Sequence, residues 1–332
     1  MNVVFIVPTG LGAEIGGHSG DATPSAKLIA SVCDKLIVHP NVVNASDINE
    51  MTENMLYVEG SILDRFLEGQ IGLEEVYNNK ILLIVNSPVK PEIINAVSGA
   101  RATIGADIKI LELKTPIKMK SMTESITGLA TGKLEGIDEA IKQIAPFDFD
   151  VLVVNTPIDS NENDVRNYLI NDGGVNIWGG VEAKLSKVMS HQLNKPVIHA
   201  PVENSEIFKT FNDVVDPRKA AEMISVCYLH CCIKGAHVTP KISLEDNAYW
   251  NTDIDFLVTP IGLYGTPHRA CQKAKIPIIA VKENKTILSL EMPSDVIIAQ
   301  NYLEVAGIIS AKKAGITLES IKRPLEKTTI LK

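Results

Sequence analysis

Histidine and glutamate side chains stand beside several short apolar runs of this chain, and enzymes use these residue types to transfer protons. His39 and His199 come at the ends of runs rich in Val and Ile. Glu59 follows another apolar run, and Glu182 follows a glycine-dense segment. Histidine titrates near neutral pH, and burial raises the pKa of a carboxyl group towards it. We therefore predict that these four residues, together with His268 in a loop after a further apolar run, carry acid/base catalysis.

Three of these residues also have a structural interpretation. His39 could be incidental to a turn formed by the Pro-Asn pair that follows it. Glu59 could pair with Arg65 on the next helix. Glu182 could complement the dipole of the helix that it enters. The sequence leaves both interpretations open for each residue.

Two glycine-rich segments, residues 8–22 and 171–182, are the candidate binding loops. Glycine lets the backbone approach a ligand closely and direct free N–H groups at an anion, although it also suits a tight mobile connection. We predict a small anionic metabolite, a carboxylate or phosphate, with Arg269 either binding its acid group or forming a surface salt bridge. The predicted binding residues are Thr9, Gly10, Gly12, Gly16, Gly17, Asp21, Asn41, Asn44, Gly173, Gly174, Gly179, Gly180, Thr259 and Arg269.

The first glycine-rich segment lacks the G-x-G-x-x-G spacing of a dinucleotide-binding loop. Its glycines run Gly10, Gly12 and Gly16, and His39 follows the second apolar run in place of an acidic residue for a ribose. We therefore predict an isomerase, racemase or lyase that needs no cofactor. The alternatives are a lyase or hydrolase that uses a divalent metal, a non-enzymatic metabolite sensor in two parts, and a nicotinamide or nucleotide enzyme.

Composition excludes several classes of protein. Of 332 residues, 45% are hydrophobic and 22% are charged, which is typical of globular chains. The formal charge of -8, without a block of Lys or Arg, argues against a nucleic-acid partner. No apolar run approaches the roughly 20 residues that cross a bilayer, so we expect no membrane partner. A homo-oligomer is expected, with a dimer as the commonest form.

The five cysteines do not indicate a disulfide framework, because their number is odd. Cys227 and Cys231 are four residues apart in an apolar segment of helical period, so we expect them to pack in the core. No second cysteine pair completes a zinc site, and we predict no metal ligands. A reducing cytoplasm is the expected location.

The elements that must position these residues alternate along the chain. Short apolar runs alternate with segments of helical period, which predicts an α/β fold with mostly parallel, doubly wound sheets. Pro146 precedes a new buried run, so we expect two α/β lobes, residues 1–150 and 151–332, with the site in the crevice between them. The expected strands are 3–7, 35–38, 81–85, 108–113, 151–154, 196–199, 255–258, 277–281 and 296–299, and the expected helices are 24–34, 91–105, 133–144, 181–193, 217–235 and 302–314.

Several of these segments resemble a family of uncharacterised proteins catalogued as DUF3326. The matching stretches are residues 7–22, 39–45, 57–60, 63–66 and 301–304. The resemblance covers essentially the whole chain and implies a full-length module without attached domains. It brings no activity and no site residue with it, so the functional predictions rest on the residues themselves.

Overall fold

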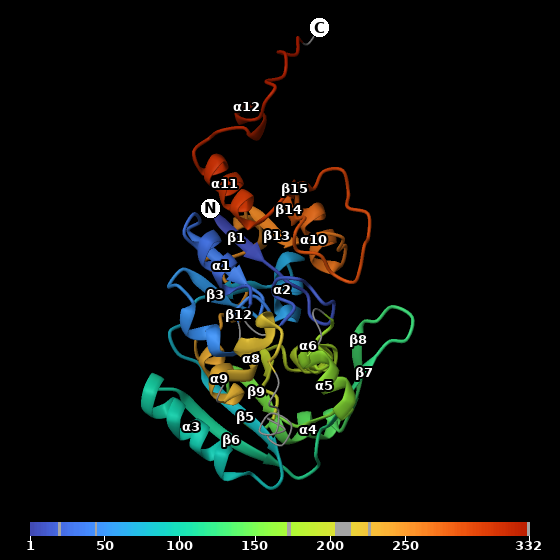
Figure 1. Cartoon of the computed structure of the whole chain (residues 1–332). Helices are drawn as coiled ribbons and strands as arrows, with labels where there is room; N and C mark the ends of the chain where they lie inside the picture. The colour runs from blue at the N-terminus through green and yellow to red at the C-terminus, as the bar shows by residue number, and fades with distance from the viewer. Residues whose placement is uncertain (19–20, 44, 171–173, 203–213, 225–226, 331–332) are drawn as a thin grey trace.

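A six-stranded parallel sheet forms one end of the molecule (Figure 1). The computed structural model describes residues 1–18, 21–43, 45–170, 174–202, 214–224 and 227–330. The strand order is β15-β14-β13-β1-β2-β3, and every neighbouring pair is parallel. The strands are β1 (Asn2–Phe5), β2 (Lys35–Val38), β3 (Met55–Tyr57), β13 (Phe256–Pro260), β14 (Ile278–Val281) and β15 (Ile297–Ala299).

A four-stranded parallel sheet lies towards the other end of the molecule, with the order β11-β9-β5-β6. Its strands are β5 (Lys80–Asn86), β6 (Asp107–Leu113), β9 (Val151–Asn155) and β11 (Val197–His199). The runs expected as strands account for every strand of the two sheets except β3. The predicted α/β fold with mostly parallel sheets is therefore confirmed.

The six-stranded sheet is assembled from both ends of the chain. In chain order its strands run 3-2-1-4-5-6 across the sheet, the doubly wound order in which ligands bind between the first and fourth strands. The second sheet is inserted between β3 and β13. An antiparallel pair, β4 (Gly72–Glu74) and β12 (Lys241–Ser243), joins the outgoing and returning chain.

The boundary predicted near residue 150 does not separate the two sheets. β1 pairs with β13, and β5 pairs with β9, so each sheet combines strands from both sides of that position. Pro146 marks only the end of a helix, whereas the insertion is defined by strand pairing over long sequence distances. The arrangement of the chain in two lobes stays a prediction.

Helices cover both faces of the six-stranded sheet because its strands are apolar on both sides. Val3 and Phe5 face one apolar cluster, which includes α1 (Thr23–Ala30) and α11 (Tyr302–Lys313). Val4 faces the opposite cluster, which includes α2 (Gly60–Leu67) and α10 (Thr266–Ala274). Successive side chains of a strand point to opposite faces, so this run fills both cores.

The four-stranded sheet is covered in the same way. α3 (Pro91–Ile104) and α9 (Tyr228–Val238) lie on one face, and α4 (Ile137–Ile144) and α6 (Gly179–Leu193) lie on the other. Tyr57, at the end of β3, packs into the cluster beneath α9. The apolar cores of the two sheets are therefore in contact.

Two of the expected helices differ in the structure. Residues 133–135 belong to β8 (Ala130–Glu135), which pairs with β7 (Lys118–Thr123) in a side sheet that also contains β10 (Ile158–Asp159). This pairing is non-local, and it overrides the helical period of the sequence. Within 217–235, a turn at Pro217–Lys219 leads into α8 (Ala220–Ile224), and α9 begins only at Tyr228.

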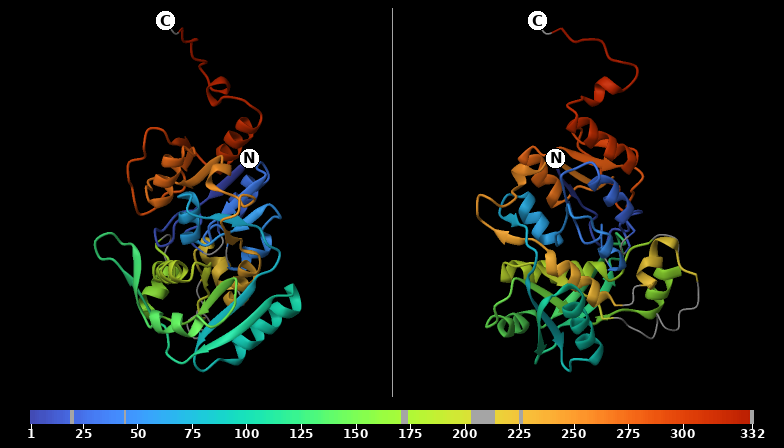
Figure 2. Two further views of the ribbon diagram at one scale, coloured as in Figure 1. Left: turned by 180° about the vertical axis from the view of Figure 1, so that it is seen from behind. Right: turned by 90° about the vertical axis from the view of Figure 1, so that its left-hand side faces the viewer.

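The remaining described helices are short. They are α5 (Glu162–Ile170), α12 (Leu318–Ile321) and 3₁₀ turns at Ala45–Glu50 and Asn251–Asp253. None of the helices in the described ranges is long and apolar enough to cross a bilayer. Beyond α11 the chain extends away from the sheets (Figure 2).

Gly180 allows α6 to lie directly against the backbone of β8. A Cβ atom at Gly180 would be 2.1 Å from the carbonyl oxygen of Ala130. Gly307, in the middle of α11, has no heavy atom within 4 Å of the equivalent position. The two helical glycines therefore differ in the space around them.

We expect Gly180→Ala to lower the free energy of unfolding by about 1–3 kcal/mol, the usual cost of overpacking. Gly307→Ala is the matched control and should raise it by about 0.5–1 kcal/mol, because alanine is the better helix former. Chemical denaturation followed by circular dichroism measures both values. Equal stability of the two variants would contradict this account of α6.

Candidate functional site

A cavity of about 460 Å³ opens at the carboxyl ends of β1, β2, β3 and β13, and α6 and the end of β11 close its other side. This volume is typical of small-molecule sites. The polar lining residues include Thr9, His39, Asn41, Glu59, Asp64, Asn176, Glu182, Lys187, His199, Glu222 and His268. The five predicted catalytic side chains come from five different segments of the chain, and all five line this cavity.

Glu182 and His199 form a hydrogen-bonded pair in the cavity wall. The Nδ1 atom of His199 lies 2.9 Å from Oε1 of Glu182, and its Nε2 atom lies 3.2 Å from both the hydroxyl and the carbonyl oxygen of Thr156. The side chain of His199 is 1% exposed and that of Glu182 is 24% exposed. Glu182 is therefore the more exposed member of the pair, and the buried His199 fixes the position of its carboxylate through the hydrogen bond.

Glu222 adds a second carboxyl group close to Glu182. It lies on α8, it is buried, and it lines the cavity. Burial, followed by the negative charge of Glu182, raises the pKa of Glu222 to about 7. The hydroxyl of Tyr168 donates a hydrogen bond to its Oε2 atom at 3.3 Å. Glu222 can therefore carry a proton at neutral pH.

His39 accepts a hydrogen bond from the backbone in this structure. Its Nδ1 atom accepts the backbone N–H of Asn41 at 3.1 Å, which places the ring proton on Nε2. Burial lowers the pKa of His39 to about 4. Asn41 also lines the cavity. The predicted role of His39 in acid/base catalysis stays a prediction.

Glu59 caps the first turn of α2. Its carboxylate accepts the backbone N–H groups of Ser61 and Ile62 at 2.9 and 3.2 Å and the Ser61 hydroxyl at 2.5 Å. Burial raises the pKa of Glu59. The predicted alternative, an ion pair with Arg65, is not formed, because Arg65 donates to Oδ1 of Asn194. Glu59 therefore has a structural role at the cavity wall.

His268 is held by hydrogen bonds on both ring nitrogens. Nδ1 accepts the N–H of Gly265 at 3.1 Å, and Nε2 donates to the hydroxyl of Thr259 at 3.0 Å. Burial lowers the pKa of His268 to about 4, so the ring is neutral. Thr259 is fully buried and does not line the cavity. Arg269 is exposed outside the cavity, with its guanidinium 3.4 Å from the Thr266 hydroxyl, so it is not placed to bind a ligand there.

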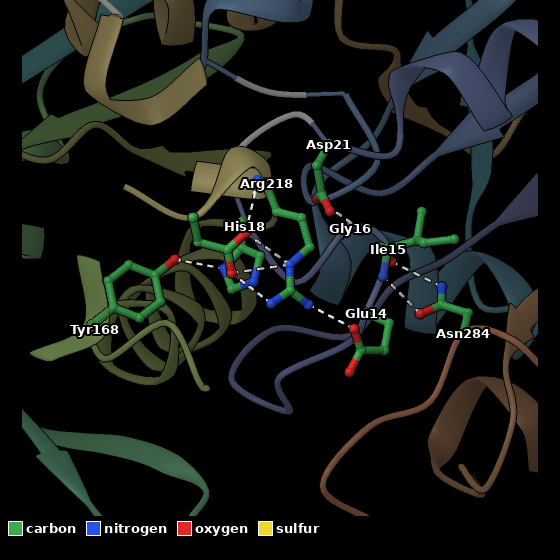
Figure 3. A network of polar contacts seen from close by, with 9 residues as sticks. Glu14, Ile15, Gly16, His18, Asp21, Tyr168, Arg218 and Asn284 are labelled. Carbon is green, nitrogen blue, oxygen red and sulfur yellow. Dashed lines mark hydrogen bonds and ion pairs between the residues drawn. The ribbon is translucent and has the colours of Figure 1, made fainter. Parts of the chain in front are cut away.

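The first glycine-rich loop folds around a carboxyl group of its own. The N–H of Gly16 donates to Oδ1 of Asp21 at 2.8 Å, and burial raises the pKa of Asp21 to about 7. Arg218 anchors the loop by an ion pair with Glu14 at 2.6 Å (Figure 3). Asn284 also holds the backbone of Ile15 from the other side. The loop thus binds Asp21 where an anionic ligand was predicted.

The two glycine-rich loops also pack against each other. A Cβ atom at Gly12 would lie 2.9 Å from the carbonyl oxygen of Gly174, and one at Gly179 would lie 2.4 Å from Cγ2 of Thr9. Close packing of the two loops therefore explains these glycines, with backbone opposite Gly12 and the Thr9 side chain opposite Gly179. Thr9 and Asn41 line the cavity, but Gly10, Gly12, Gly16, Gly17, Asp21, Gly174, Gly179 and Gly180 do not. Asn44 and Gly173 lie outside the described residues.

Carboxyl groups outnumber cations in the described lining of the cavity. Glu59, Asp64, Glu182 and Glu222 face the single ammonium group of Lys187. An anion entering this cavity would meet like charges in a poorly hydrated environment, which is unfavourable. The charge of the lining therefore does not favour the anionic metabolite predicted from the glycines.

No group of three or more His, Cys, Asp or Glu side chains in the described ranges is arranged to hold a metal ion. The metal-dependent alternative consequently has no ligand set in that part of the chain. Cys231 is buried in the cluster beneath α9, as expected for a core residue, and Cys232 is buried beside it. Cys227 is partly buried and precedes the first turn of α9.

The sequence matches a family model described as a protein of unknown function (DUF3326) over residues 2–322. The chain belongs to this family. The match confirms the resemblance seen in the sequence, and it assigns no activity. No solved structure matches the chain.

An uncharacterized lipoprotein of Synechococcus sp. is 30% identical to this DUF3326 chain over 333 residues, which cover 94% of the chain and 91% of the relative. Its name contradicts the cytoplasmic location that we predicted. The prediction rested on cysteine content, which bears on disulfides but carries no information about attachment to a membrane.

Sequence inspection missed Glu222, Asp64 and Tyr168 of this DUF3326 protein. Glu222 stands among apolar residues in the sequence Ala-Ala-Glu-Met-Ile, and a carboxyl group on the apolar side of a short helix is a signal that could have been used. Asp64 lies five residues after Glu59 on an amphipathic segment. Tyr168 has no local signal, because its partners His18 and Glu222 are distant in the sequence.

The raised pKa of Asp21 predicts a specific pH dependence of stability. The carboxyl group has a pKa near 3.8 when unfolded and about 7 when folded, so the native state binds more protons between these values. We expect the free energy of unfolding to fall as pH rises from about 4 to about 7. Asp21→Asn should remove this contribution in denaturation curves measured across that range.

Asp246→Asn provides the matched control, because Asp246 is exposed. It should leave the slope of stability against pH unchanged. Parallel curves for the original protein and Asp21→Asn would show that Asp21 is not the buried acid described above.

Proposed function

We propose that this protein is an enzyme that transfers protons to and from a small metabolite, as an isomerase, racemase or lyase. The observation that carries the proposal is the pair of neighbouring carboxyl groups, Glu182 and Glu222, in one cavity. Their surroundings differ, since Glu182 accepts a hydrogen bond from His199 and Glu222 has a pKa of about 7. Two carboxyl groups in unlike environments are a common basis for assigning a base and an acid.

In this proposal Glu182 is the general base. Its carboxylate removes a proton from a carbon of the substrate, and the electron pair of that C–H bond moves towards a neighbouring oxygen or leaving group. The Nδ1–H of His199 orients Glu182 and stabilises its charge before the transfer. His39 offers Nε2–H to the oxygen that gains negative charge.

Glu222 is the general acid of the same reaction. It returns a proton either to carbon, which completes an isomerisation or racemisation, or to a leaving group, which completes an elimination. Tyr168 holds Glu222 through the hydrogen bond to Oε2. A second turnover requires that Glu182 lose its proton and that Glu222 regain one.

The strand order of the six-stranded sheet favours a dinucleotide enzyme as a second candidate. The lining counts against it, because a diphosphate would meet several carboxyl groups at the ends of β3, α6 and α8. The N–H of Gly16 is also already bonded to Asp21. A fold supports many chemistries, so the proposal rests on the residues of the site, which support acid/base chemistry.

The test is solvent deuterium exchange. The purified protein is incubated in heavy water with a mixture of small metabolites, and mass spectrometry detects compounds that gain deuterium at carbon. We expect at least one metabolite to gain mass in the presence of the protein. Glu182→Gln should slow this exchange by about 100-fold or more, in line with the loss of a general base.

Glu245→Gln is the matched control, because Glu245 is exposed and lies outside the cavity lining. It should retain full exchange. The proposal fails if no metabolite gains deuterium beyond the protein-free sample, or if folded Glu182→Gln exchanges as fast as the control. Binding without exchange would instead support the non-enzymatic sensor.

A further inference from the structure

Asp64 differs from the other carboxyl groups of the cavity, because its carboxylate has no partner within hydrogen-bonding or ion-pair distance in the described part of the chain. Glu59 is bonded to the start of α2, Glu182 to His199, and Glu222 to Tyr168. Asp64 lines the same cavity from α2 and is only partly exposed. A carboxylate that is partly shielded from water inside a cavity, and that has no partner from the protein, is available to bind a cationic group of a ligand.

We propose that the substrate carries an ammonium group bound by the Asp64 carboxylate, with an apolar body held by the rest of the cavity. The proposal deepens the proposed function by naming the substrate class of that site. It leaves Glu182 and Glu222 for proton transfer and gives Asp64 a role in specificity.

The charges around Asp64 favour a cation from the ligand. Lys187 and Arg269 are its nearby positive groups, and Glu68 is a nearby negative one. Both Lys187 and Arg269 are exposed, and neither is within 4.0 Å of the carboxylate, as a salt bridge would require. His39 and His268 are neutral, so they do not supply a charge. A ligand ammonium would therefore be the closest positive charge to Asp64.

The remaining lining is suited to an apolar body. Leu63 precedes Asp64 on α2, and Leu263, Leu288 and Leu290 line the cavity from the segments that follow β13 and β14. Trp178 adds an indole ring at the start of α6. Burying apolar area contributes roughly 25 cal/mol per Å², so such walls retain a hydrocarbon or aryl group.

Three matched probes test the proposal by isothermal titration calorimetry with the full chain: 2-phenylethylamine, 2-phenylethanol and 3-phenylpropanoate. We expect the amine to bind at least about tenfold more tightly than the alcohol, which corresponds to one charge-assisted hydrogen bond. The carboxylate should bind most weakly. Asp64→Asn should weaken binding of the amine by about tenfold and leave the alcohol unchanged.

Asp246→Asn is the control for a charge lost at an exposed position. The melting temperature of each variant verifies that it is folded. The proposal is overturned if the amine and alcohol bind equally, if the carboxylate binds more tightly than the amine, if Asp64→Asn leaves amine binding unchanged, or if the amine does not bind.

Failure of the ammonium-substrate proposal can be distinguished from failure of the proposed proton-transfer function. Deuterium exchange on an anionic metabolite would retain the proton-transfer enzyme and reject the ammonium substrate. Amine binding that depends on Asp64, without deuterium exchange into any metabolite, would retain the binding of an ammonium group by Asp64 and reject the proton-transfer enzyme. Once a substrate is known, Asp64→Asn should raise KM and leave kcat nearly unchanged, because Asp64 binds without taking part in proton transfer.

Discussion

The pairing of β1 with β13 is the interaction on which the rest of the structure depends. Val3, Val4 and Phe5 are in parallel register with Phe256, Leu257 and Val258. The six-stranded sheet therefore forms only when the two ends of the chain meet. That contact holds the inserted sheet at both of its connections, and it brings together the loops that follow the first and fourth strands. The cavity opens at this junction, where doubly wound sheets bind ligands.

Desolvation then determines what the polar residues of the cavity can do. Burial raises the pKa of Glu222 to about 7 and lowers that of His39 to about 4. The pKa of the Glu222 carboxyl group is therefore higher than that of the His39 imidazole, which reverses the usual order. The carboxyl group is the one that titrates near neutral pH. Residue type alone favours histidine as the group that titrates near neutral pH, whereas burial gives this property to Glu222.

The glycines show how one sequence feature can serve two purposes. A glycine-rich loop after a strand is typical of an anion site, and here Gly16 does donate its N–H to a carboxyl group, that of Asp21. The carboxyl group belongs to the protein. Gly12 and Gly179 are required for a different reason, since the two loops approach each other too closely for a side chain.

The sequence by itself determined the α/β class, nearly all strands of both parallel sheets and the positions of His39, Glu59, Glu182, His199 and His268 at the cavity, because apolar period and strand ends are local properties. It did not reveal the insertion between β3 and β13, the side sheet containing β8, or the proximity of Tyr168, Glu222 and Glu182. Those features arise from contacts between residues far apart in the chain. Burial and charge at Asp64 and Glu222 likewise exist only after folding, so the tertiary structure alone decided how the pKa values of these two carboxyl groups are shifted.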